Sequence, residues 1–137
     1  MTGTMTAHSA AGVAETVAAL RAEIEKRGAS VAAVVDHAAA ARTVGLTMPE
    51  TQVIVFGNPA AGTPLMQSVP DIALDLPLRI MVRDDGGGGG SAVVWQDPAF
   101  VAQRFGLGEE LLGPLHAPAA IVAAVISTAV PAEGEPQ

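Results

Sequence analysis

The sequence contains no cysteine and no tyrosine, and lysine occurs only once, as Lys26. The absence of cysteine excludes a disulfide scaffold, thiolate chemistry and a zinc–cysteine site. Charged residues make up 15% of the chain and aromatic residues 3%, and the formal net charge of −7 argues against a broad basic surface for nucleic acid. Half of the 137 residues are hydrophobic, so the chain can bury enough surface to fold. We therefore expect one compact domain over residues 1–137.

No segment of the sequence is typical of a targeting signal or a membrane span. The first nine residues lack both a basic and an apolar stretch, which argues against a secretory signal. The longest apolar run, Ala119–Val130, is shorter than the roughly 20 residues that cross a bilayer. It also lacks the basic face that would attract anionic lipid. We expect a soluble, cytoplasmic protein that binds neither membrane nor nucleic acid.

Helices and strands are predicted to alternate through the first half of the chain, and a hairpin follows. Apolar residues spaced by four and three predict a first helix over Ser9–Gly28, with Ser9 as its N-cap. The run Gly86–Gly90 is expected to be a hairpin tip. The predicted strands are Thr2–His8 (at an edge), Ala29–Val35, Thr51–Phe56, Leu78–Arg83 and Ser91–Gln96. The further helices are His37–Val44, Pro59–Asp75 (one broken helix or two short ones), Pro98–Phe105, Glu109–Leu115 and Ala119–Val130.

This order of elements predicts an α+β fold. We expect two layers, with a mixed β-sheet of about four to five strands and helices packed mainly on one face. The helix over Ala119–Val130 is too apolar to stay solvated on any side. It should be covered either by the sheet of its own subunit or by a partner.

The segment Gly57–Thr63 is similar to a phosphate-binding loop, because it follows a strand and has glycines five positions apart. Such a loop requires lysine after its second glycine, and Thr63 stands there. Asn58 followed by Pro59 is instead typical of a helix start, with asparagine as N-cap and proline at the first helical position. A nucleotide-hydrolysing function is therefore disfavoured, although a helix start still offers free N–H groups to an anion.

Asp36 and His37 form a polar pair at the carboxyl end of an apolar strand, where ligand sites of α/β sheets concentrate. Two roles are open. Asp36 can cap the helix that begins at His37, which is the commoner role, or the pair can carry chemistry.

Arg79 lies in an otherwise apolar strand entry and would need a carboxylate partner, for which Asp75, Asp36 and Asp97 are candidates. A solvent-facing position on the sheet is an equally reasonable interpretation. Trp95, the only tryptophan, is expected to pack in a core or an interface with its N–H satisfied.

Neither a nucleophile nor a metal site is indicated. The five serines show no G-x-S-x-G motif that would activate one of them. His8, His37 and His116 are isolated, with no H-x-x-x-H spacing and no clustered carboxylates. We expect no metal and no cofactor.

Several short motifs follow one another in order from about Ser9 to Leu107. They are Asp36-His37-Ala38-Ala39-Ala40-Ala41, Val44-Gly45-Leu46, Phe56-Gly57-Asn58-Pro59, Gly62-Thr63-Pro64-Leu65-Met66, Ala73-Leu74-Asp75-Leu76-Pro77-Leu78-Arg79 and Asp97-Pro98. Together they resemble domain-of-unknown-function family 302. The resemblance implies a small two-layer α+β fold and a homodimer, and it implies no reaction. It covers residues 9–107 and leaves residues 108–137 as a C-terminal helical extension.

The sequence departs from this family at two positions that bear on function. Trp95-Gln96 stands where the family commonly has Tyr-Asn before Asp-Pro, and Phe105 stands where it often has a histidine. A haem, metal or proton-transfer role that depends on that histidine is in doubt for this chain.

The sequence thus favours a dimeric small-ligand-binding or interaction module over an enzyme. The alternative is a small enzyme or a ligand or haem sensor with a pocket around Asp36, His37, Asn58 and Arg79. If a ligand site exists, its expected residues are Asp36, His37, Asn58, Thr63 and Arg79.

Overall fold

Five antiparallel strands form one sheet in the order β1-β5-β4-β3-β2. The structure is a computed structural model that describes residues 3–129, so the predicted strand end Thr2 and helix end Val130 lie outside the described residues. The strands are β1 (Thr4–Ser9), β2 (Ser30–Asp36), β3 (Thr51–Gly57), β4 (Leu78–Asp84) and β5 (Ser91–Gln96). All four neighbouring pairs are antiparallel, and β1 and β2 form the two edges of the sheet. The α+β fold is confirmed, whereas the expected mixed sheet is wrong.

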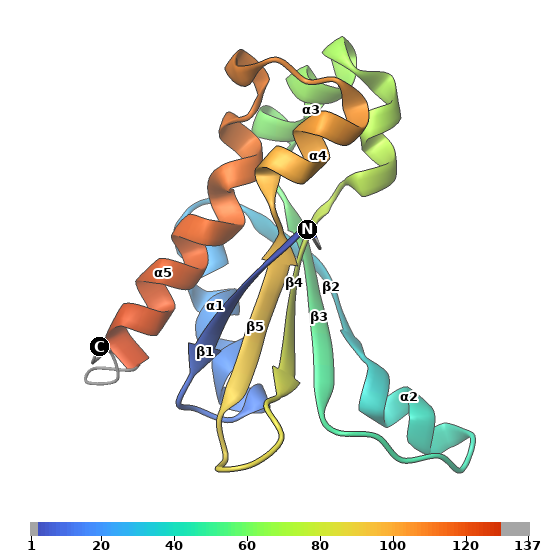
Figure 1. The fold of residues 1–137 in the computed structure, drawn as a ribbon, viewed down its shortest axis with the longest axis vertical. Coiled ribbons are helices and arrows are strands. Elements are labelled where there is room, and N and C mark those ends of the chain that lie inside the picture. Colours follow the sequence, from blue (N-terminus) through green and yellow to red (C-terminus); the bar gives the residue numbers. More distant parts are fainter. Residues whose placement is uncertain (1–2, 130–137) are drawn as a thin grey trace.

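Two helices, α1 (Val13–Lys26) and α5 (Ala117–Ala129), cover one face of the sheet, which we call the inner face (Figure 1). On the other face, the outer face, no helix of residues 3–129 belongs to the main core. The main core lies between the inner face and these two helices. Its fully buried members include Leu20, Ile24, Ile54, Ile80 and Val93.

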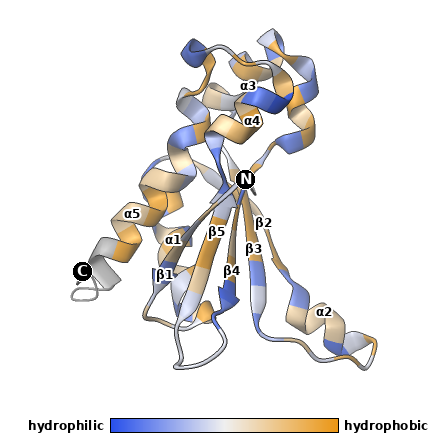
Figure 2. Ribbon diagram, viewed as in Figure 1, coloured by the Kyte–Doolittle hydropathy of each residue, from blue (hydrophilic) through white to orange (hydrophobic). Residues whose placement is uncertain are grey.

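Helix α5 packs on the sheet of its own subunit. Ile121 and Val122 are 1% and 2% exposed, and Val125 is also buried in the main core. Figure 2 shows the apolar residues along this helix. Of the two coverings expected for the apolar segment Ala119–Val130, the structure therefore has the intramolecular one.

The remaining helices lie at the two ends of the sheet (Figure 1). At one end, five short helices surround a second, smaller core made of Leu65, Ile72, Val101 and Leu115. At the other end, one helix stands away from the sheet. The five are α3 (Pro59–Ser68), α4 (Pro98–Phe105) and the 3-10 helices η1 (Pro70–Asp75), η2 (Glu109–Leu111) and η3 (Gly113–His116), and the one that stands away is α2 (His37–Thr43). The predicted Pro59–Asp75 segment thus forms two short helices.

Ser9 ends β1 and does not cap α1, whose N-cap is Gly12. Its hydroxyl is instead 2.9 Å from the hydroxyl of Thr16, which lies 3.2 Å from that of Ser91. All three side chains are at most 1% exposed, and the Ser91 hydroxyl donates to the carbonyl of Ala11 at 2.9 Å. This buried network joins the start of α1 to the β1–β5 pair, and its internal partners offset the cost of burying hydroxyls.

Replacing Thr16 by valine should lower the free energy of unfolding by about 1–2 kcal/mol, because the other two hydroxyls each lose a partner in a buried site. Urea unfolding followed by circular dichroism measures this. Thr43→Val is the matched control, since the Thr43 hydroxyl is exposed and bonds only locally, to the carbonyl of Ala40; its effect should stay within about 0.5 kcal/mol. Equal effects of the two substitutions would contradict a stabilising role of the network.

Candidate functional site

A groove of about 660 Å³ opens at the end of the sheet where β2 begins and β3 ends. Helix α3, the segment before β4 and the beginning of α5 form its other walls. Most of the lining is apolar, and small residues such as Ala61, Gly62 and Ala117 leave the space open. Larger apolar side chains lining the groove are Phe56, Leu65, Met66, Leu76, Leu78 and Ile121.

The turn after β3 determines where α3 lies. The Asn58 side chain accepts a hydrogen bond from the amide of Ala60 at 3.0 Å, and Pro59 follows at the first helical position. This confirms Asn58 as the N-cap. Because the helix begins at Pro59, Gly62 and Thr63 are helical, and the Gly62 amide donates to the Asn58 carbonyl at 2.9 Å. The segment is therefore not a phosphate-binding loop.

Polar groups of the groove are few. Asn58, Thr63 and Ser30 contribute uncharged ones, and Arg27 is the one charged side chain among the described lining residues. The Arg27 guanidinium is held by Glu23, with Nε donating to Oε2 at 2.7 Å. An apolar groove with a single cation at its wall can hold a mainly apolar molecule that carries a polar or anionic end. Its described lining contains no Asp, Glu or His, and so no side chain typical of general acid–base catalysis.

The five residues expected from the sequence do not meet in one cavity. Asn58 and Thr63 line the groove, but Asp36 pairs with Gln52 at the far end of β2, whereas Ser30 pairs with Gly57 at the groove end. Asp36 lies six positions after Ser30 along β2, a distance of roughly 20 Å. The expectation rested on the rule for parallel sheets, in which carboxyl ends of strands lie together. In this antiparallel sheet, the neighbouring strands β2 and β3 end at opposite ends of the sheet.

Asp36 caps α2. Its Oδ1 accepts a hydrogen bond from the amide of Ala39 at 2.9 Å, which confirms the commoner of its two expected roles. His37 is the first residue of the helix and is exposed.

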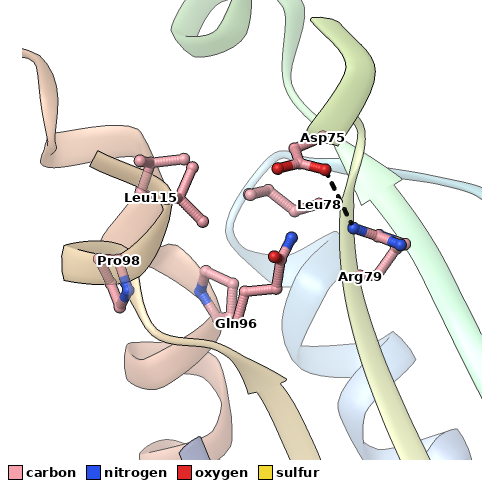
Figure 3. A pocket seen from close by; sticks show the side chains of 8 residues that line it. Asp75, Leu78, Arg79, Gln96, Pro98 and Leu115 are labelled. Carbon is pink, nitrogen blue, oxygen red and sulfur yellow. Dashed lines mark ion pairs between the residues drawn. The ribbon is translucent and has the colours of Figure 1, made fainter. Parts of the chain in front are cut away.

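Arg79 pairs with Asp75, one of its three expected partners (Figure 3). The Asp75 carboxylate is 8% exposed and lies 3.7 Å from Nη2 of Arg79 and 3.1 Å from Nη1 of Arg104. Two cations on β4 and α4 thus compensate a buried carboxylate on η1, whose desolvation would otherwise cost several kcal/mol. The cluster borders a cavity of about 20 Å³, enough for one water molecule. We interpret it as a structural link between the sheet and the small helices.

Trp95 packs in the main core and is 8% exposed, as the sequence indicates. Its indole Nε1 is buried and has no hydrogen-bond partner among the described residues, so the expected satisfied N–H is wrong. The core packing of the ring, rather than a hydrogen bond, holds this side chain.

Two further properties limit the chemistry of the described part of the chain. No group of three His, Cys, Asp or Glu residues in residues 3–129 is placed to hold a metal ion. Over the same residues, no helix has the length and apolar character needed to cross a membrane.

Sequence analysis missed several groove residues, of which Arg27, Met66 and Ala117 are examples. They come from separate elements and form no motif along the chain. Arg104, the second cation on Asp75, was missed for the same reason, since 29 residues separate the two.

The fold and the groove define a small α+β protein with one helix-covered sheet face and an apolar groove at the end of the sheet. The family described as "Domain of unknown function DUF302" matches residues 5–128, and the chain belongs to this family. The match includes most of the C-terminal segment that the sequence resemblance left out.

A solved structure has the same fold. It is the crystal structure of an uncharacterized conserved DUF302 protein from Bacillus stearothermophilus, with a TM-score of 0.78 over 94% of this chain and 99% of that chain. The sequence identity is 15%, so the likeness concerns the fold alone.

Curated relatives are closer in sequence but longer. Fluoride-specific ion channel FluC 1 of Brucella suis biovar 1 (strain 1330) is 44% identical over 109 residues, which are 77% of this chain and 41% of that protein. Fluoride-specific ion channel FluC 1 of Brucella abortus biovar 1 (strain 9-941) has the same identity, with 77% and 39% covered. This chain therefore spans about two fifths of the length of the curated relatives it matches.

Two substitutions distinguish the hydrogen bond by which Asp36 caps α2 from the effect of its negative charge. Asp36→Ala should lower the free energy of unfolding by about 0.5–2 kcal/mol, because the Ala39 amide loses its acceptor. Asp36→Asn keeps an acceptor oxygen and should retain most of the stability, since asparagine caps about as well as aspartate. Urea midpoints of the three proteins measure this, and a loss in Asp36→Asn as large as in Asp36→Ala would assign the effect to the charge.

Proposed function

We propose that this protein is a small-molecule-binding module without catalytic activity, which acts in the cytoplasm as a homodimer. Its ligand would occupy the groove between α3, the start of α5 and the β2–β3 end of the sheet. The observation that carries the proposal is the groove itself: its volume of about 660 Å³ lies within the range of roughly 300–1,000 Å³ for small-molecule sites, and its lining is mainly apolar.

The ligand class follows from the lining. Apolar side chains favour an aliphatic or aromatic body, and Asn58 and Thr63 offer hydrogen-bonding groups to a polar end. Arg27 favours an anionic end, since a guanidinium already held by Glu23 loses little freedom on binding. We therefore propose an amphipathic molecule with a negative or polar end.

The alternative function, an enzyme or a ligand or haem sensor built around Asp36, His37, Asn58 and Arg79, receives less support from the geometry. Asp36 and His37 lie at the opposite end of β2 from Asn58, and Arg79 is paired with Asp75. A histidine at that distance cannot act on a molecule held in the groove. Binding without catalysis is the simpler proposal.

Filling the groove should weaken the binding of an apolar anion. Anilinonaphthalene sulfonate, an aromatic sulfonate whose fluorescence rises in apolar surroundings, is a suitable probe. Ala61→Trp places an indole on the groove wall and should weaken the affinity roughly tenfold or more, a loss of about 1.4 kcal/mol. Arg27→Gln should weaken it less, by removing only the cation. Fluorescence titration of the folded proteins measures both effects.

Ala60→Trp is the matched control for the filled groove, because Ala60 lies on the same helix, is exposed and does not line the groove. Its affinity should equal that of the wild type, and all variants should show the same urea midpoint. Equal binding by Ala61→Trp and Ala60→Trp would place the probe elsewhere and remove the support for a ligand in the groove.

A second candidate function comes from the Brucella relatives. Those proteins are fluoride-specific ion channels, and the matched stretch is about two fifths of each. Since no helix within residues 3–129 of this chain can cross a membrane, the conducting part of such a protein would lie outside the match. We propose that the matched stretch is an accessory module of the channel and that this chain can take the same role.

An exchange experiment tests this second candidate. Deleting the matched 109 residues from the Brucella suis relative should change its fluoride flux, and inserting residues 5–128 of this chain in their place should restore it. A fluoride electrode on channel-loaded liposomes measures the flux. Unchanged flux after the deletion would contradict an accessory role, and a failure of the insertion to restore flux would contradict its transfer to this chain.

A further inference from the structure

The outer face of the sheet carries a continuous apolar row. Strand pairing places Val35 beside Val53, Val53 beside Met81, and Met81 beside Val94. Val55 extends the row toward the groove end. These side chains point away from α1 and α5, because the residues between them along the strands, such as Ile54 and Ile80, belong to the main core.

A second apolar surface projects from the β2 edge of this sheet. Helix α2 and the following segment, residues 44–50, form an arm that stands away from the body of the molecule (Figure 1). Ala38 is the one residue of α2 that is fully packed. Beyond the helix, Val44 is 70% exposed, Leu46 63% and Met48 41%. Three large apolar side chains on one projecting segment are costly to leave in water.

We propose that a second copy of this chain docks outer face to outer face, with the two arms completing the interface. This inference rests on the homodimer proposed above and names the surface that forms it. The contact is isologous, because the same apolar row of each copy meets its equivalent in the other.

The shape of the outer face suits a second sheet. Its central side chains are those of valine and methionine, which carry no charge. Sheets with apolar faces pack face to face about 10 Å apart. The outward positions of the five described strands hold no carboxylate. Of the two outward arginines on β4, Arg79 pairs with Asp75 at the end of the strand near η1, and Arg83 lies near the other end, where it can remain in solvent.

The area explains why the arm belongs to the interface. Five strands about 4.8 Å apart and six to seven residues long present a face on the order of 500 Å². A stable interface of standard size buries about 800 Å² on each partner. The sheet face alone is too small for a stable dimer. The arm follows directly on β2 at the edge of the sheet, and in the proposed interface its exposed side chains supply the additional apolar area.

Sedimentation velocity of the full chain tests the interface. The wild type should be a dimer at micromolar concentration. Leu46→Asp and Met81→Glu should each raise the dissociation constant roughly tenfold or more, because each places a charge in the desolvated contact. Ala22→Glu is the control, since Ala22 is exposed on α1, the helix that covers the inner face; its dissociation constant should equal that of the wild type.

The outcomes separate this inference from the proposed function. A dimer that neither Leu46→Asp nor Met81→Glu weakens would overturn the interface and leave the homodimer standing. A monomeric wild type would overturn both the interface and the homodimer, while probe binding in the groove would be unaffected. Circular dichroism verifies folding, and Leu46→Asp, which lies on an exposed segment, keeps the test valid if Met81→Glu does not fold.

Discussion

The apolar contact between the inner face of the sheet and helices α1 and α5 is the interaction on which the rest of the structure depends. Leu20 and Ile24 of α1 and Ile54 and Ile80 of the sheet are completely buried in it. Both long helices pack on this one face, so no helix of the described residues covers the outer face. Helix α1 also connects β1 at one edge of the sheet to β2 at the other, and every neighbouring pair of strands is antiparallel.

The strand directions in turn decide what the ends of the sheet can contain. At the end where β2 begins and β3 ends, the chain turns at Asn58 into α3, and the start of α5 lies opposite. The helix layer and the small helices meet there without filling the space between them, which leaves the groove. At the other end, Asp36 caps α2, which projects beyond the end of the sheet (Figure 1). A polar pair after an apolar strand thus has different meanings in parallel and antiparallel sheets, because only in parallel sheets do such pairs gather at one edge.

Local signals in the sequence predicted local structure well. Asn58 and Asp36 each cap the helix that follows, since a short polar side chain before a helix acts through an amide two or three residues away. Ser9 does not cap α1: its hydroxyl lies against that of Thr16, seven residues further on, and Thr16 in turn contacts Ser91, another 75 residues along the chain. The groove and the Asp75–Arg104 pair depend on contacts between distant segments, and no spacing along the chain encodes them. The mixed sheet was expected from alternating helices and strands, but that alternation does not determine which strands become neighbours.

The low charge content of the chain is reflected in the centre of the outer face, where charged residues are missing. An antiparallel sheet with one solvated face commonly carries polar residues on that face, but here the central outward positions of β3, β4 and β5 are Val53, Val55, Met81 and Val94. The groove is apolar as well, yet the two surfaces differ in kind. The groove is concave and lined by side chains of several elements, which suits a small molecule. The outer face is a strand surface, of the kind that packs face to face on a second sheet in β-sandwiches. Because the groove opens at the sheet end and the row runs across the strand centres, one surface can be occupied without blocking the other. The proposed dimer would therefore keep the groove of each copy available for the proposed ligand.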